Sequence, residues 1–392
     1  MNIPLHSPTV LAILFSLYIP ITSGFSLFFA HIFFLIWVFF IVISHIKLLS
    51  LNMLVASYAA FTLLILSFST LIYIDMGSRF SQDTVKIFIL IFSVITLSNF
   101  KKSDELMEIL IRMMLFLPIV IIFYIIFIHE GSLFTYSNRF YIEFFGSPNV
   151  LGLVAGLSII ILLFSSKIFI LIKTLIITIY LAIIIAGFSR AVIIGLIISL
   201  FTSPKGRYIL KIFFILTSII LIFLISTNIL VVPEWILMKI GLAEGTASIG
   251  NDERHIVWNA TLLQIFDSTI SFLFGNTPGG EIVELGYNKI ARHPHNTYLF
   301  SLWAYGIIGF IFLISSIAIV VRKTFFTKDY RHMKISLLVF YLVVFFMDTH
   351  ILAGQFLLIH IFILSFLFSS NQRLPMNTKY HNQNKGIRII EK

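Results

Sequence analysis

The chain of 392 residues contains no cysteine, which excludes disulfide bonds, thiolate metal sites and cysteine nucleophiles. It is also poor in charge, since charged residues make up 11% of it, against about a quarter in a soluble domain. It has no Walker phosphate loop, no H-E-x-x-H zinc motif and no glycine-rich dinucleotide loop before a predicted strand. A soluble globular enzyme and an intrinsically disordered chain are therefore excluded, and nucleotide hydrolysis has no site.

Hydrophobic residues are abundant instead: they make up 59% of the chain and include 43 phenylalanines. Such a composition suits a protein whose outer surface faces hydrocarbon. About twelve apolar segments are long enough, or nearly so, for a bilayer core that takes about 20 helical residues. They lie near residues 8–23, 25–46, 51–74, 85–100, 105–128, 148–165, 172–188, 191–203, 209–231, 295–321, 334–349 and 352–370. The sequence therefore predicts an all-α, polytopic transmembrane helical bundle of about 12 spans, in which the break at 188–191 is either a loop or a kink within one long helix.

The distribution of basic residues gives this bundle an orientation. With the N-terminus in the cytoplasm and strict alternation, 19 of the 27 Lys and Arg residues fall on the inner side and 8 on the outer side. This agrees with the positive-inside rule and places both termini in the cytoplasm. The same rule explains the formal net charge of +10. Because no basic patch is interleaved with aromatic residues on a soluble surface, we expect no nucleic-acid partner.

The predicted organisation has four parts. Residues 1–231 hold about nine spans, 232–294 form one large periplasmic loop, 295–370 hold about three spans, and 371–392 form a polar, basic cytoplasmic tail that we expect to be disordered and near anionic lipid. Long loops inside compact proteins are usually functional. Within this one, apolar residues recur at helical spacing over 254–274, which predicts a helix lying at the membrane interface with Trp235 and Trp258 as anchors. The recurring residues are Ile256, Ala260, Leu263, Ile270 and Leu273.

Cations at the predicted outer face are candidate site residues, because this face should hold few of them. Arg190 lies between two apolar runs and is either an anion ligand facing a cavity or an arginine that snorkels at a helix end. Arg254 opens the amphipathic helix. It is a second candidate anion ligand, or a member of a solvated loop in which Asp252 and Glu253 neutralise it.

Two further clusters open predicted spans. Arg292, His293 and His295 precede the tenth span, and Asn296 is placed to cap it. The helix dipole disfavours an imidazolium at a helix N-terminus, so His295 is a candidate proton acceptor, with a structural histidine as the alternative. At the head of the sixth span, one further set of residues either faces the same vestibule or includes only an ordinary helix-start signal at Pro148. That set is Arg139, Tyr141, Glu143 and Asn149.

A metal-dependent site is not predicted. The acidic residues form no Asp-x-Asp clamp for a sugar diphosphate, and His293 and His295 would bind a metal only with ligands from elsewhere in the chain. We therefore expect a site without metal or cofactor, in which arginines hold an anion.

His295-Asn296, nine residues, Gly306, two residues and Gly309 form the first of four short motifs. This motif resembles the signature of the O-antigen ligase and polymerase superfamily, which stands at the head of a late span. The other three motifs resemble, in turn, its large-loop stretch, its "SR" motif and its "npN" motif. They are Arg254-x-x-x-Trp258 followed by Phe274-Gly275-Asn276, Ser189-Arg190, and Ser147-Pro148-Asn149. The likeness covers roughly residues 139–310, and the number of spans agrees over the whole chain.

The resemblance implies a glycosyltransferase of the bacterial inner membrane that uses an undecaprenyl-diphosphate-linked glycan at the periplasmic face. The family's two arginines and its histidine map onto Arg190, Arg254 and His295, which are then catalytic. Substrate-binding roles are expected for a wider set. That set is Arg292, His293, Asn296, Arg139, Asn149 and Tyr141.

Three functions stay open at this point. The shared motifs do not separate a polymerase from a ligase, but the modest size of the large loop and the Ile- and Phe-rich composition favour an O-antigen polymerase. Such an enzyme joins lipid-linked repeat units, and the resemblance implies a chain-length regulator as its partner. The first alternative is an O-antigen ligase, which transfers the glycan to lipid A-core. The second is a flippase or transporter for the same lipid-linked oligosaccharide, which the absence of an internal sequence repeat disfavours.

Overall fold

The computed structural model describes residues 94, 98, 102–127, 148–166, 168–187, 189–204, 206–208, 254–276, 282–284, 290–291, 294–347 and 357–370. The predicted spans near 8–23, 25–46, 51–74 and 209–231 and the tail at 371–392 lie outside these residues. The described part is helical except for one antiparallel pair of two-residue strands, β1 (Val283–Glu284) and β2 (Ile290–Ala291). This confirms the all-α class for the part of the chain that is described.

The helices coincide with the predicted apolar segments to within a few residues. The four before the large loop are α5 (Ser103–Phe127), α6 (Pro148–Phe164), α7 (Ile170–Gly187) and α8 (Arg190–Phe201). Within the loop lie α11 (Arg254–Ile265) and α12 (Thr269–Phe274), and after it come α13 (Thr297–Phe326), α14 (Arg331–Met347) and α15 (Leu357–Phe368). Hydrophobic runs of this length satisfy their backbone hydrogen bonds internally as helices, which is what hydrocarbon requires.

Three of the described helices, α5, α7 and α13, are long and apolar enough to cross a membrane. On α7 the outward side chains are large and aliphatic, and Ile170, Leu171 and Leu175 are 62–70% exposed. Exposure of such side chains to water costs free energy, whereas exposure to lipid does not. The described helices therefore suggest a membrane protein, while the count of about twelve spans and the sidedness remain predictions.

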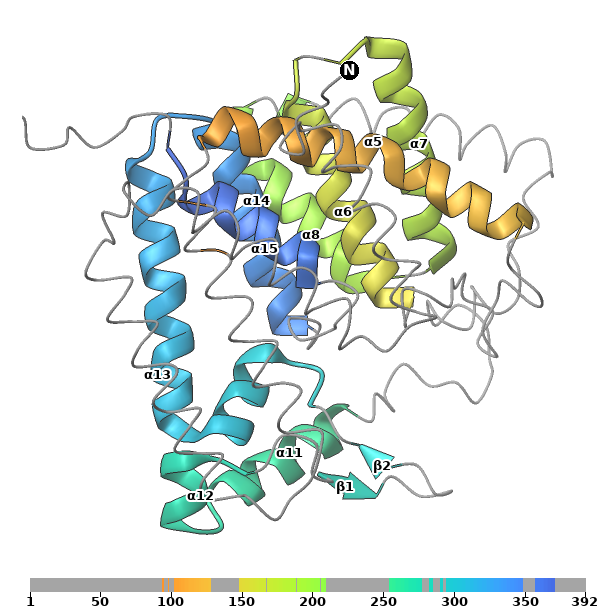
Figure 1. The fold of residues 1–392 in the computed structure, drawn as a ribbon. Helices are drawn as coiled ribbons and strands as arrows, with labels where there is room; N and C mark the ends of the chain where they lie inside the picture. Colours follow the sequence, from red (N-terminus) through yellow and green to blue (C-terminus); the bar gives the residue numbers. More distant parts are fainter. Residues whose placement is uncertain are drawn as a thin grey trace, which may run out of the picture.

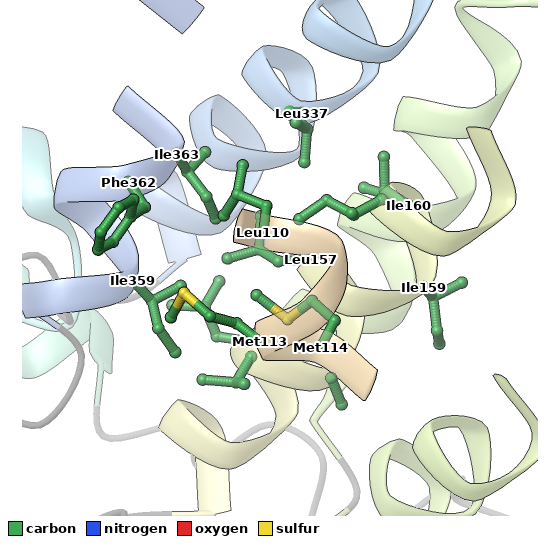
Figure 2. Packing of buried hydrophobic residues seen from close by; sticks show 14 of the residues in the cluster. Leu110, Met113, Met114, Leu157, Ile159, Ile160, Leu337, Ile359, Phe362 and Ile363 are labelled. Atoms are coloured by element: carbon green, nitrogen blue, oxygen red, sulfur yellow. The ribbon is translucent and has the colours of Figure 1, made fainter. Parts of the chain in front are cut away.

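The interior of the bundle is built from α5, α6, α14 and α15. Figure 2 shows their apolar side chains meeting, with Leu110 and Met114 of α5 beside Leu157 of α6, and Phe362 of α15 close by. Two hydrogen bonds reach Met114 from different helices: Tyr180 of α7 donates to its carbonyl oxygen at 2.8 Å, and the Ser158 hydroxyl of α6 points at its sulfur at 2.7 Å. These two buried hydroxyl groups are thus paired, as burial requires.

The directions of the helices define two ends of the bundle. A Cβ atom on Gly152 of α6 would lie 2.9 Å from the Cβ of Ser189, so α6 and α8 begin side by side. Along α14 the contacts run the opposite way, since Gly195 lies against Val344 whereas the Thr202 hydroxyl is 3.1 Å from that of Ser336. Because α8 returns parallel to α6, the chain reverses between α7 and α8, and the alternative of one kinked helix is wrong.

We call the two ends by one residue each. The Arg190 end is where α6, α8 and α13 begin and α14 stops, and the Lys334 end is where α6 and α8 stop and α5 and α14 begin. Lys173, Lys323 and Lys334, all predicted to be cytoplasmic, lie at the Lys334 end. The structure therefore separates these lysines from Arg190 in the way that the charge rule requires.

The helix α13 consists of two pieces that meet at Gly306. This residue has φ +65° and ψ −172°, a conformation that is nearly exclusive to glycine, and it divides residues 297–305 from a long second piece. Figure 1 shows this second piece extending beyond the rest of the bundle to α11 and α12. The kink allows the first turn of α13 to return to the bundle, where the Tyr298 hydroxyl donates to the Leu342 carbonyl oxygen at 3.2 Å.

The prediction of a single amphipathic helix over 254–274 is wrong in one respect, because the structure divides this segment into α11 and α12. Ser268 is extended and its hydroxyl accepts from the backbone N–H of Ser271 at 3.0 Å, so it caps a new helix and ends the continuity of the old one. The buried face of α11 consists of Val257, Thr261 and Ile265. Most of the predicted apolar stripe, including Leu263 and Ile270, points outward, as an interfacial helix would require.

Candidate functional site

The Arg190 end gathers the starts of two bundle helices that carry predicted site residues. Arg190 is the first residue of α8, it is exposed, and it directly follows the buried Ser189. Asn149, which is half-buried, is the second residue of α6. Since Gly152 and Ser189 are in close contact, Asn149 and Arg190 belong to adjacent helix starts on one side of the molecule.

Trp258 connects the large loop to this end. Its indole N–H donates to the Pro294 carbonyl oxygen at 2.6 Å, and its ring lies edge-on to Phe346 with centroids 6.3 Å apart. Phe346 belongs to the last turn of α14, and Pro294 directly precedes His295. Trp258 thus binds its polar atom to the protein and brings the start of α11 to the start of α13. Its predicted role as an interfacial anchor stays a prediction, and Trp235 lies outside the described residues.

The head of α13 has the capped geometry that the sequence predicts. Asn296 is buried, and its side-chain oxygen accepts from the Leu299 backbone N–H at 3.0 Å. His295, just before it, is exposed and has φ +49°, in the left-handed region. The amide oxygen of Asn296 is therefore used by the fold, whereas the imidazole of His295 is directed to the surface of the Arg190 end.

The glycines of two family-like motifs contact each other. A Cβ on Gly275 would lie 2.5 Å from the backbone nitrogen of Gly306, and a Cβ on Gly306 would lie 2.3 Å from the Leu273 carbonyl oxygen. Both residues have positive φ, at +87° and +65°. Only glycine allows this approach of two backbones, so the motifs at 274–276 and 306 are two halves of one joint.

Two residues at this joint, Gln264 and Trp303, were not predicted from the sequence. The Trp303 indole N–H donates to the Gln264 side-chain oxygen at 2.7 Å, and the Gln264 amide donates to the Ile282 carbonyl oxygen at 2.9 Å. A signal for Trp303 existed, because a tryptophan in an apolar run needs a partner for its N–H. Nothing in the sequence identified that partner as Gln264, since 39 residues separate the two.

The electrostatic character of the Arg190 end follows from these helix starts. Arg190 opens α8, Arg254 opens α11, and His295 precedes the cap of α13. A helix N-terminus carries partial positive charge, so a cation there is disfavoured by roughly 0.3–1 kcal/mol and an anion is favoured. Cations added to helix N-termini produce a region of positive potential that a bound anion would relieve.

The structure describes five of the nine predicted site residues. Contacts from α8 through α14, Trp258 and Pro294 link the elements carrying Arg190, Arg254, His295, Asn149 and Asn296. Arg254 is half-buried, one helical turn before Trp258. The other four, Arg139, Tyr141, Arg292 and His293, lie outside the described residues. Sequence comparison adds no identification: no protein-family model and no curated protein matches the chain.

Proposed function

We propose that this chain is an O-antigen polymerase, an inner-membrane glycosyltransferase that joins undecaprenyl-diphosphate-linked oligosaccharide repeat units at the periplasmic face without a metal. The observation that carries the proposal is the position of Arg190, Arg254 and His295 at helix N-termini belonging to one end of the molecule. The contact between Gly275 and Gly306 supports it further, because the family-like motifs that hold these glycines form one unit.

The arginines suit a diphosphate leaving group. A guanidinium is always charged and offers two parallel N–H donors to a phosphate, which an ammonium does not. In the proposed reaction Arg190 and Arg254 bind the diphosphate of the donor and stabilise the charge that develops on its oxygen as the glycosidic bond breaks. The helix N-termini of α6, α8 and α11 add backbone N–H groups of the same sign.

His295 supplies the base. A hydroxyl of the incoming repeat unit attacks the anomeric carbon of the donor, and its proton passes to the imidazole. The bond between the anomeric carbon and the diphosphate oxygen breaks, and the electron pair leaves with undecaprenyl diphosphate. This is a direct displacement with inversion and without a covalent enzyme intermediate. The exposed imidazole at the head of α13 is accessible to such an acceptor.

The test is reconstitution of the purified protein in vesicles with a lipid-linked repeat unit, without an energy source or added metal. The proposal predicts a ladder of products that differ by one repeat unit. Transfer only when lipid A-core is added would indicate a ligase instead, and movement across the vesicle without ladders would indicate a flippase. Either result would contradict the proposal.

A variant control makes the assay specific to the site. His295→Ala should remove the ladder while the vesicle-bound protein still binds the lipid-linked donor, because the histidine acts on the acceptor. Leu263→Ala, at an exposed position of α11 away from the motif, should keep the ladder.

A further inference from the structure

Three residues form a closed ring of hydrogen bonds between the large loop and α13. The Trp303 indole N–H donates to the Gln264 side chain at 2.7 Å, the Asn276 backbone N–H donates to the Trp303 carbonyl oxygen at 2.6 Å, and the Asn276 side-chain amide donates to the Gln264 carbonyl oxygen at 3.2 Å. Each residue is therefore hydrogen-bonded to the other two: Asn276 donates twice, Gln264 accepts twice, and Trp303 donates once and accepts once. Such a ring fixes three segments at once, namely the last turn of α11, the residues after α12 and the first piece of α13.

The ring lies among apolar side chains, so the loss of one of its hydrogen bonds would cost more free energy than at the surface. Trp303 is 1% exposed and packs with Val257, Ile265 and Phe300 in a second hydrophobic cluster. A buried indole N–H that loses its acceptor costs about 1–3 kcal/mol, so the first piece of α13 has a strong preference for the position in which Gln264 receives it. The side-chain NH2 group of Gln264 donates to the Ile282 carbonyl oxygen.

The ring is the second of two attachments between α11 and the head of α13. The first is the bond from Trp258 to Pro294, six residues earlier on α11, which is about 9 Å along the helix. Since residue numbers rise in the same direction along both segments, their N-terminal ends point the same way. One attachment would leave the segments free to pivot, whereas two fix Arg254 relative to His295.

We propose that Gln264 is a positioning residue for the glycosyl transfer, because it holds the His295-bearing piece of α13 in a fixed relation to Arg254. This inference rests on the proposed function. Gln264 does not contact the reacting atoms: its contacts are with Trp303, Asn276 and Ile282. Its effect is to keep the base and the diphosphate-binding arginine at a constant separation, and an error of about 1 Å in such a separation costs about 100-fold in rate.

The first experiment measures geometry and does not depend on the reaction. Because the chain has no cysteine, two nitroxide labels can be placed at Asn259→Cys and His295→Cys, both exposed positions. In otherwise wild-type protein, the spin–spin broadening should correspond to a single short label–label distance with a narrow distribution. Gln264→Leu should widen that distribution of distances. An unchanged spectrum in the Gln264→Leu protein would overturn the proposal, whatever the protein catalyses.

The second experiment measures turnover of the lipid-linked repeat unit in unlabelled protein. Gln264→Leu should lower kcat roughly 10- to 100-fold and leave KM for the donor within about threefold, since the diphosphate is still bound. Trp303→Phe removes the other partner of the same bond, so the double variant should be no slower than the slower single variant. Losses that multiply, or a change confined to KM, would overturn the positioning role.

The two experiments separate the two claims. A wild-type protein without glycosyl transfer activity would end the proposed function, while the label pair would still decide whether Gln264 fixes the two segments. Gln264→Glu sharpens the second experiment, because it keeps an acceptor for Trp303 and loses the donor to Ile282. It should retain more turnover than Gln264→Leu, and an equal or greater loss would contradict the assignment of the effect to the Trp303 bond.

Discussion

At one end of the bundle, lysine side chains reach the carboxyl ends of neighbouring helices, and at the other end arginines open their own helices. At the Lys334 end, the Lys334 ammonium donates to the Ser369 carbonyl oxygen at 2.6 Å, directly after α15, and Lys173 donates to the Ser165 carbonyl oxygen at 2.6 Å, directly after α6. At the Arg190 end, Arg190 and Arg254 are the first residues of their helices. The lysines therefore complement the dipoles of α15 and α6, although each lies in the first turn of its own helix, whereas the arginines oppose the dipoles of α8 and α11.

The two ends of the bundle therefore have different roles. At the Lys334 end, Lys334 also lies 3.3 Å from the Ser103 hydroxyl and over the Phe366 ring at 4.9 Å. Nearby, Tyr330 donates to Asp104 at 2.6 Å, and burial together with this carboxylate raises the pKa of Tyr330 to about 12. Cations arranged in this way stabilise the fold. A cation at the first residue of a helix is opposed by the helix dipole, and such a position suits an anion that arrives from outside.

Removing His295 should give the largest effect, and it should fall on activity alone. We expect His295→Ala to lower turnover roughly 100- to 10,000-fold, because a general base contributes that much. His295→Asn is the matched variant, since asparagine tolerates the left-handed backbone at φ +49° but cannot act as the base. Product ladders and thermal unfolding measured together test this, and near-normal elongation in both variants would remove His295 from the mechanism.

Removing Lys334 should give the largest effect on stability. The side chain is 0% exposed, so Lys334→Ala leaves a cavity and an unpaired Ser369 carbonyl oxygen, which we expect to cost roughly 2–5 kcal/mol in the free energy of unfolding. Lys334→Met restores the volume and should recover part of this loss. Lys328→Met, at an exposed position in the neighbouring connection, is the control. Equal unfolding midpoints for Lys334→Ala and Lys328→Met would contradict the structural role of this end.

Arg190→Lys keeps the charge and loses the planar pair of donors. Because a lost transition-state donor typically costs 100- to 1,000-fold, we expect a severe loss of turnover with little change in stability. Arg207→Lys makes the same change at the other end of the bundle, at an exposed position beyond α8. If both variants retain the same activity, the contrast between the two ends has no functional content.

Gly306→Ala tests the glycine joint. The backbone conformation alone costs about 1–3 kcal/mol for a residue with a Cβ, and the added atom would also lie 2.3 Å from the Leu273 carbonyl oxygen. We expect lower stability and a loss of turnover, whereas Ala318→Gly, a one-methyl change at an exposed position of the same helix, should lose only about 0.5–1 kcal/mol. The unfolding midpoints of Gly306→Ala and Ala318→Gly, each compared with the wild type, measure these losses.

Local features of the fold were predictable from the sequence. Hydrophobic runs gave the ranges of α6, α7 and α8, because length and apolarity alone determine a buried or lipid-facing helix. Asn296 was predicted as a cap from its position before an apolar run, and its side chain does accept from Leu299. Arg190 and Arg254 were identified as cations on the predicted outer face, which follows from the pattern of apolar segments and basic residues.

Features that depend on distant pairing were not predictable. Lys334 was expected among the cytoplasmic loop residues, and the structure buries it because residues 103 and 369 bring it partners from elsewhere in the chain. The sequence did not predict a role for Gln264, because that role depends on its hydrogen bond with the distant Trp303. Ser268 divides the amphipathic helix through one capping bond, and a cap of this kind competes with helix continuation by about 1 kcal/mol, less than a hydrophobic pattern can resolve.

The most direct test of the central claim compares thermal unfolding of the wild-type protein and Arg190→Gln, with and without a short prenyl diphosphate. An anion held at the Arg190 end stabilises the folded protein in proportion to the logarithm of its concentration, by about 2.7 kcal/mol at one hundred times its Kd. The account predicts that Arg190→Gln unfolds at the same or a higher temperature than the wild type without ligand, and that the diphosphate raises only the wild-type midpoint. A diphosphate that raises both midpoints equally, or neither, would contradict it.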